Sequence, residues 1–274
     1  MVLVVPGILA TSPHLVDFHS LFRIRMDRTD SRYLTPCTWK GPILSGIIAA
    51  SLCLLLLSQS DAALSRRESH YQIQSRGFNV GELKTVMQPT EGSERLIHFE
   101  STTTVHAIFL VFGFNSKSHE EALVGEHGTL RYRLKASENG RVRVVNAHYD
   151  HGRFTLVVKE DQKSRTLIIP RDQYDYTTMD CPEMKLAREG DHSEIRLLNL
   201  EQARVVTRRY HWVRTEAVKV GNRLIHCRVI EFEDPDNRCT RWVSTDDMGV
   251  VIVRQEGKGR GGSYVLKMTD LTAS

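Results

Sequence analysis

The stretch from Arg204 to Met268 decides the fold, and it opens with VVTRRYHWV at residues 205–213. β-branched and aromatic residues dominate this segment, as a pleated and half-buried surface favours. Gly221-Asn222 follows a few residues later and is a two-residue hairpin signal, because both residues accept a positive φ. The chain is therefore expected to return along a second strand, Leu224–Phe232.

Further turn signals divide the rest of this stretch into short strands. Asp234–Asn237 predicts a turn because Pro235 presets φ and the Asp and Asn side chains bond the local backbone. Val250–Val253 is too continuously apolar for a strand with one wet face. Gly257–Gly262 is interpreted as a flexible loop before a closing strand. Consecutive hairpins of this kind predict an antiparallel sheet.

Composition fits an ordinary globular protein with one sizeable core. The chain has 274 residues, of which 41% are hydrophobic and 26% are charged. The formal net charge of +4 is small, and the basic residues are dispersed without interleaved stacking aromatics. A nucleic-acid partner is therefore not expected.

The N-terminal residues 1–62 have the layout of a leader. Gly41–Ser60 carries no charge, and Arg28, Arg32 and Lys40 precede it. Ser60 and Ala62 put small residues at −3 and −1 of a cut after Ala62, which is typical of a secretory signal peptide. The alternative is an uncleaved membrane anchor, since the run is about as long as a bilayer span.

This leader predicts the domain organisation and the location. Residues 63–274 are expected to form a single antiparallel β domain, exported to the periplasm or elsewhere outside the cytoplasm. Without cleavage, the domain would stay attached to the inner membrane through the leader alone.

Two segments of residues 63–204 stand out from the predicted strands. Val105–Phe114 is the most apolar segment of the exported part and predicts either a buried strand or the lining of a hydrophobic cavity. Asp180–Arg188 predicts a short helix, because Asp180 can cap it and Pro182 suits its first turn. Gly190 would end this helix.

Motifs that carry chemistry are scarce. His148, Asp150 and His151 flank an expected hairpin turn, and no third ligand for a metal is near in sequence. A hydrolase that uses these three residues is the third hypothesis, and neither a metal nor a cofactor is expected. The adjacent carboxylates of Glu120 and Glu121 are expected to be solvated.

The exported part contains three cysteines, Cys181, Cys227 and Cys239. If the hairpin turns at Pro235, Cys239 faces Phe232, and Cys227 is offset from it by about 16 Å along the strand. That separation is beyond the reach of a disulfide. Pairing of Cys181 with either of the others stays open.

Several glycine and aromatic positions carry a family resemblance. Tyr71-x-Ile73 is followed by Gly77-Phe78-x-Val80-Gly81, and Arg241–Asp246 is followed by Gly249-Val250-Val251. This pattern resembles uncharacterised exported bacterial domains of unknown function. The resemblance implies a mainly β fold, a curved antiparallel meander (half-barrel or open barrel) with one or two short helices, similar to the half-barrel of periplasmic lipoprotein carriers. It also implies an envelope location and a concave apolar face.

The leading hypothesis is a non-catalytic binding module of the cell envelope. Its partner would be an apolar small molecule, a lipid, or a segment of an envelope protein. The alternative is a structural or assembly protein of the envelope with a solid core. The residues expected to line the binding face are Ile108, Leu110, Phe112, Phe114, Trp212 and Trp242.

Overall fold

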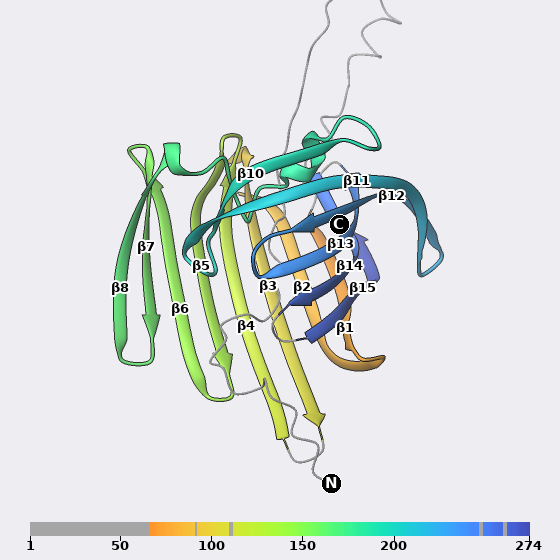
Figure 1. Cartoon of the computed structure of the whole chain (residues 1–274), viewed down its shortest axis with the longest axis horizontal. Helices are drawn as coiled ribbons and strands as arrows, with labels where there is room; N and C mark the ends of the chain where they lie inside the picture. The colour runs from red at the N-terminus through yellow and green to blue at the C-terminus, as the bar shows by residue number, and fades with distance from the viewer. Residues whose placement is uncertain (1–65, 91, 110–111, 247–248, 260–261) are drawn as a thin grey trace, which may run out of the picture. The chain divides into compact units, whose positions relative to one another are not determined.

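The computed structural model describes residues 66–274, apart from residues 91, 110–111, 247–248 and 260–261. This part of the chain forms a 15-stranded sheet in the order β8-β7-β6-β5-β4-β3-β2-β1-β15-β14-β13-β12-β11-β10-β9 (Figure 1). The strands are β1 (Arg67–Ser75), β2 (Phe78–Thr90), β3 (Ser93–Phe109), β4 (Phe112–Gly125), β5 (Gly128–Glu138), β6 (Arg141–Asp150), β7 (Arg153–Glu160), β8 (Lys163–Pro170), β9 (Tyr176–Thr177), β10 (His192–Asn199), β11 (Arg204–Val220), β12 (Arg223–Glu233), β13 (Asn237–Asp246), β14 (Gly249–Gly259) and β15 (Gly262–Ala273).

The predicted curved antiparallel sheet is confirmed. Neighbouring strands pair antiparallel throughout, except that β9 pairs parallel with β10. The first strand lies in the middle of the order, where β1 pairs with both β2 and the last strand, β15. Two 3-10 helices, η1 (Arg171–Gln173) and η2 (Pro182–Lys185), lie in the connection between β8 and β10.

The helix predicted at Asp180–Arg188 is reduced to the single turn of η2. Asp180 does not cap it. Its Oδ2 instead accepts a hydrogen bond from the backbone N–H of Thr177 at 2.9 Å and closes the preceding turn. A short polar side chain can accept a hydrogen bond from any nearby backbone N–H. The prediction that Asp180 bonds the local backbone is therefore correct, but the bonded N–H belongs to the preceding turn and not to the helix.

Two of the predicted turns form by the expected mechanism. Asp234 Oδ1 accepts hydrogen bonds from the backbone N–H groups of Asp236 and Asn237, both at 3.0 Å. Gly221 has a φ of +56° between β11 and β12. The loop predicted at Gly257–Gly262 is wrong at its start, because β14 continues to Gly259 and Gly257 pairs with Tyr264 of β15.

Strands β12, β13 and β14 bury side chains on both faces. We call the larger cluster of buried residues the main core and the smaller one the second core. Val250 and Ile252 belong to the main core, whereas Val251 and Val253 belong to the second. This two-sided burial explains why Val250–Val253 is apolar at every position.

The sheet curls so that β1 meets the hairpin between β13 and β14. Arg67 of β1 donates hydrogen bonds to Asp246 Oδ1 at 2.6 Å and to the carbonyl oxygen of Val250 at 2.8 Å. β14 pairs with β15 only from Arg254 onward, which leaves the first half of β14 outside that pairing. This half of β14 is the part that lies between the two cores.

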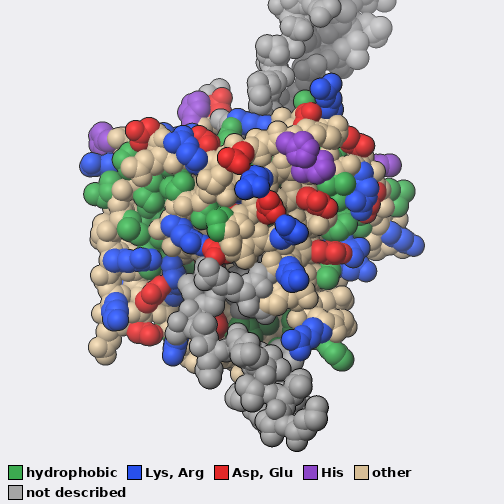
Figure 2. Space-filling view, viewed as in Figure 1, with side chains coloured by type: hydrophobic (Ala, Val, Ile, Leu, Met, Phe, Trp, Pro, Cys, Tyr) green, Lys and Arg blue, Asp and Glu red, His purple; other side chains and the backbone are tan. Residues whose placement is uncertain are grey.

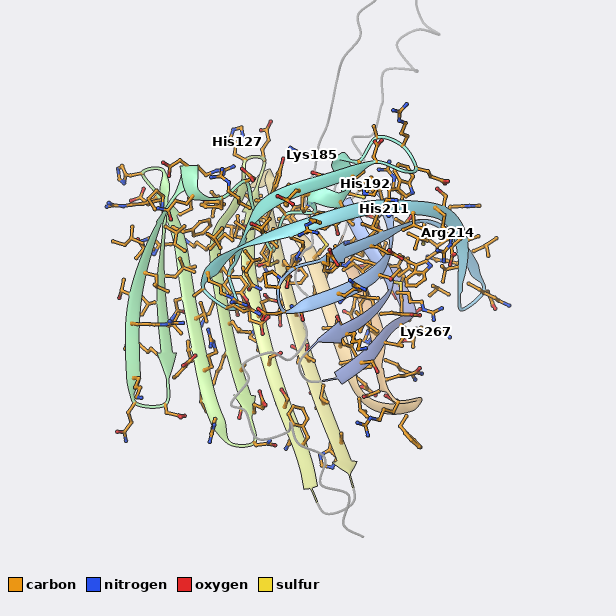
Figure 3. The ribbon with its side chains drawn as sticks, in the orientation of Figure 1. His127, Lys185, His192, His211, Arg214 and Lys267 are labelled. Carbon is orange, nitrogen blue, oxygen red and sulfur yellow. The ribbon has the colours of Figure 1, made fainter. Side chains whose placement is uncertain are left out.

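On β10 and β11, His192 and His211 are register partners (Figure 3). Their rings stack with centroids 4.0 Å apart and planes inclined by 12°. Farther along β11, a bulge between Trp212 and Arg214 shifts the register against β12. A bulge of this kind re-aims the side chains that follow it.

The apolar segment Val105–Phe114 is the end of the β3–β4 hairpin and not a single strand. Val105 and Ala107 are buried, whereas His106 between them is exposed. The predicted leader, residues 1–62, lies outside the described residues. Within the described residues, no helix has the length and apolar character needed to cross a bilayer.

Candidate functional site

The interior of the curved sheet is filled by side chains. The main core packs residues of β3–β8 against residues of β10–β14. Among the described residues, its members include Phe99, Phe154, Leu156, Leu197, Tyr210 and Phe232, each at most 2% exposed. Candidate sites must therefore be sought at the edge of the sheet and in its surface hollows.

The two tryptophans predicted as binding residues lie in different clusters. Trp212 belongs to the main core, and its Nε1–H donates to the carbonyl oxygen of Arg214 at 3.0 Å. Trp242 belongs to the second core, and its Nε1–H donates to Glu216 Oε1. This bond and the charge of Arg214 lower the pKa of Glu216.

The other predicted binding residues lie near the β3–β4 turn. Phe114 packs against the second core, which also contains Trp242. Ile108 and Phe112 lie in strands, but their side chains are outside the described part, as is all of Leu110. Ligand binding by this set stays a prediction.

One edge of the described sheet is strand β8, and the other is the two-residue strand β9. Within the described residues, β8 is the last strand of the order and pairs with β7 alone (Figure 1). A strand at an edge presents one row of backbone N–H and C=O groups without a neighbouring strand. Ile168 of β8 is 56% exposed, which is unusual for a large apolar side chain in this protein.

β8 carries positive charge and no acidic residue. Lys163 and Arg165 are exposed, and neither forms an ion pair with a described residue. The acidic residues of the preceding turn are engaged, because Glu160 pairs with Arg143 and Asp161 accepts the backbone N–H of Val142 at 3.3 Å. Figure 2 shows Lys and Arg side chains along this edge of the molecule.

Alternation along β8 sorts its side chains onto two faces. Lys163, Arg165, Leu167 and Ile169 share the face that meets the main core, where Ile169 is buried and Leu167 is partly buried. The face therefore changes from basic to apolar along the strand. Sequence analysis missed the role of this strand, although its Lys163, Arg165 and terminal Pro170 are typical of an edge.

A second candidate is a hollow of about 260 Å³ beside Trp212, which we call the Trp212 hollow. Residues of β11, β12 and β13 form most of it, and η2 contributes Met184. Its lining residues are Met184, Trp212, Thr215, His226, Cys227, Arg228, Val243, Ser244 and Thr245.

Arg228 is fixed at the wall of this hollow. Its guanidinium carbon lies 4.3 Å from the centroid of the Trp212 ring, a cation–π contact. Its Nη1 donates to the carbonyl oxygen of Leu186 at 3.0 Å. Burial lowers the pKa of Arg228, but a guanidinium stays protonated at neutral pH.

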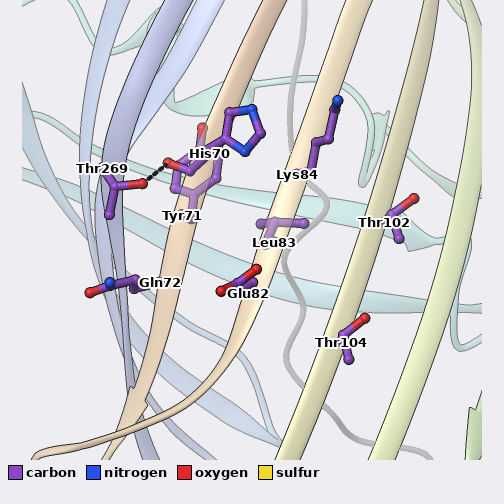
Figure 4. Close-up of a pocket in the computed structure, with 9 residues that line it drawn as sticks. All are labelled: His70, Tyr71, Gln72, Glu82, Leu83, Lys84, Thr102, Thr104 and Thr269. Carbon is purple, nitrogen blue, oxygen red and sulfur yellow. Dashed lines mark hydrogen bonds between the residues drawn. The ribbon is translucent and has the colours of Figure 1, made fainter.

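A third feature is a shallow groove of about 310 Å³ on the outer face of β15, β1, β2 and β3 (Figure 4). Thr269 Oγ1 donates to the carbonyl oxygen of His70 at 3.1 Å beside it. Glu82 and Lys84 both line the groove, so neither sign of charge prevails there.

Among the described residues, two ion pairs have both side chains buried. Arg241 Nη1 donates to Glu183 Oε1 of η2 at 2.8 Å, and both side chains are fully buried. Arg208 pairs with Asp234 at 2.7 Å. The two guanidinium carbons lie 4.7 and 4.8 Å from the centroid of the Phe232 ring. Removal of one partner from a buried ion pair strongly destabilises a fold. The network therefore holds η2 on the sheet.

The hydrolase candidates lie at an exposed turn. His151 Nδ1 lies 2.6 Å from Asp150 Oδ2, and the two side chains are 83% and 65% exposed. Within the described residues, no group of three His, Cys, Asp or Glu side chains is arranged to hold a metal. The expectation for Glu120 is wrong, because it is 1% exposed and faces the interior.

Comparison with known proteins places the chain in a family. Residues 70–269 match DUF3108, described as a protein of unknown function. The chain belongs to the DUF3108 family. No curated protein matches this DUF3108 sequence.

The DUF3108 fold also has a similar solved structure. It is a crystal structure described as a beta-barrel-like protein of domain of unknown function DUF1849 from Brucella abortus. The match has a TM-score of 0.54 at 12% identity and covers 77% of this chain and 98% of that chain. At this identity, the match supports the fold alone.

Proposed function

We propose that this DUF3108 domain is a non-catalytic binding module of the cell envelope that holds an extended acidic protein segment along β8. The observation that carries the proposal is the eight-residue edge strand, which pairs with β7 alone among the described strands. Its free backbone groups offer a ladder to one more strand.

The side chains of β8 specify the partner. An added strand places alternate residues opposite Lys163, Arg165, Leu167 and Ile169. An antiparallel segment would therefore read apolar-x-apolar-x-acidic-x-acidic. Acidic residues opposite Lys163 and Arg165 form cross-strand pairs, each worth about 0.2–1 kcal/mol, and the backbone bonds supply most of the affinity.

The envelope location rests on the predicted leader. The uncharged run Gly41–Ser60 and the small residues at Ser60 and Ala62 are typical of exported proteins. Mature protein that begins near Ala63 in the periplasmic fraction supports this part of the proposal. Protein that keeps its leader and stays in the cytoplasm contradicts it.

A structural role is the second candidate, and the filled main core favours it. A protein that only packs as a scaffold would leave the β8 edge without a ligand. The two candidates differ in one measurable property, which is the affinity of β8 for an added strand.

The test uses a synthetic peptide with the pattern above and measures its binding by fluorescence anisotropy. Charge reversal in Lys163→Glu/Arg165→Glu is expected to weaken binding about tenfold or more, because both cross-strand pairs become repulsive. Lys135→Glu, on the exposed face of β5, is the matched control and is expected to bind normally.

Site-resolved NMR gives a second readout. Chemical-shift changes are expected in β7 and β8. Binding that is equal in the reversed and control variants, or shift changes confined to other strands, would refute strand addition at β8 and leave the structural role.

A further inference from the structure

We infer that the Trp212 hollow binds a small oxyanion, of which inorganic phosphate is the simplest example. The site is separate from β8 and does not depend on the proposed function. None of its nine lining residues is acidic, whereas Arg228 and His226 are basic. The electrostatic character of the hollow therefore favours an anion.

Arg228 is prepared for such a ligand. Its Nη1 is occupied by the carbonyl oxygens of Met184 and Leu186 at 3.4 and 3.0 Å. Its Nε–H and Nη2 donors have no acceptor among the described residues, and the side chain forms no ion pair there. Stacking on Trp212 fixes the plane of the guanidinium, so little side-chain entropy remains to be lost on binding.

Hydroxyl groups lie beside the same space. Thr215 and Thr245 line the hollow on the same face of the sheet as Arg228, and neither hydroxyl has a hydrogen-bond partner among the described residues. A guanidinium with neighbouring hydroxyl donors is a common protein environment for phosphate or carboxylate oxygens.

The carboxylates next in sequence to the lining residues Met184, Thr215 and Thr245 are occupied elsewhere. Glu183 pairs with Arg241, and Asp246 pairs with Arg67. Glu216 accepts the Trp242 indole N–H and pairs with Arg214. Arg228 is thus a basic side chain whose counter-charge is not supplied by the described residues.

Size narrows the ligand further. Sites for drug-sized molecules usually measure about 300–1,000 Å³, and this hollow falls below that range at about 260 Å³. A free oxyanion or one anionic end group fits, whereas a lipid chain does not. Titration with phosphate and with acetate distinguishes a site for phosphate-type oxyanions from a site for carboxylates.

The experiment follows the indole N–H resonance of Trp212 in the full-length chain while phosphate is added at constant ionic strength. Saturable shifts are expected with phosphate and not with added chloride. Arg228→Gln is expected to weaken phosphate binding about tenfold or more, because it removes a charge-assisted donor pair. Arg209→Gln, at an exposed site on the same strand as Trp212, is the control and is expected to bind normally.

A second variant separates loss of the ligand contact from destabilisation of η2, which Arg228→Gln could also cause. Thr245→Val removes one lining hydroxyl, and Thr245 forms no hydrogen bond with the residues of η2. It is expected to weaken phosphate binding severalfold while the thermal midpoint stays unchanged. Shifts that never saturate, or affinities that are equal in Arg228→Gln and the parent chain, would overturn the site. Saturation by acetate with no response to phosphate would restrict it to carboxylates.

Discussion

Glu183 of η2 accepts a hydrogen bond from Arg241 of β13 at 2.8 Å, and neither side chain has any exposed surface. The pair joins the connection between β8 and β10 to β13, which contributes Cys239 and Val243 to the main core. Gln255 Oε1 also accepts from Arg241 Nε at 2.7 Å, so the guanidinium is held from two elements.

Removal of this carboxylate is expected to destabilise the fold. Glu183→Ala removes a buried anion that contacts the fully buried Arg241, and a loss of about 3–5 kcal/mol in the free energy of unfolding is expected. Denaturant titration measures it. Glu194→Ala is the control, because Glu194 pairs with Arg209 at 3.2 Å in an exposed position. That change is expected to cost about 0–1 kcal/mol, and equal losses would contradict the assignment of a structural ion pair.

Gly257 and Tyr264 give a second prediction. They are register partners on β14 and β15, and a Cβ on Gly257 would lie 2.2 Å from Tyr264 Cε1. Gly257→Ala is therefore expected to lower the free energy of unfolding by about 1–3 kcal/mol, since the ring must shift within a packed environment. Gly113→Ala is the matched control because no atom of the described residues, apart from its chain neighbours, lies within 4 Å of its Cβ position. If Gly257→Ala leaves the free energy of unfolding unchanged, the Tyr264 ring can move away from this contact without cost.

The sequence could predict most of the local structure but not the order of the strands in the sheet. The turn at Asp234–Asn237 and the two-sided burial of Val250–Val253 both follow from residue chemistry and local pattern. The pairing of β1 with β15 does not, because it joins residues about 200 positions apart and leaves no periodic signal. The bulge at Trp212 likewise changes which residues share a face without any marker in the sequence.

The candidate sites were only partly predictable for the same reason. Trp212 was singled out as an apolar residue, yet its neighbour Arg228 becomes informative only once β11 and β12 pair. The edge position of β8 depends on the long-range order of all the strands. The charges of β8 can be read from the sequence, but the lack of a second pairing strand among the described residues cannot.

The carboxyl group of Glu68 is expected to titrate far below its ordinary range. Lys84 lies 2.6 Å from Glu68 Oε1, His70 2.8 Å from it, and Arg66 2.7 Å from Oε2. The hydrogen bond from Lys84, followed by those from His70 and Arg66, lowers the pKa of Glu68 to about 2. Carboxyl NMR titration is expected to give a midpoint near that value.

This lowered pKa has a consequence for stability. A carboxyl group with a depressed pKa in the folded state stabilises the fold above its unfolded pKa of about 4.5. The contribution is lost as pH falls from about 4.5 toward 2. Glu68→Gln is therefore expected to flatten the pH dependence of unfolding in this window and leave its shape unchanged above it. A parallel loss at every pH would show that the ion cluster contributes no proton linkage.

The thiol of Cys227 provides the last prediction. Cys227 is a buried free cysteine of β12, and burial, together with the smaller effect of the Glu216 charge, raises its pKa to about 11. Only the thiolate reacts with iodoacetamide, so at pH 8 its thiolate fraction is roughly a hundredfold lower than that of an ordinary cysteine. The peptide that contains Cys227 is expected to stay unmodified in the folded protein, as measured by mass spectrometry, and to be alkylated fully in guanidinium chloride. Rapid alkylation of the folded chain at Cys227 would mean that the strand opens readily. It would also place a reactive thiol in the Trp212 hollow, which the buried position of Cys227 argues against.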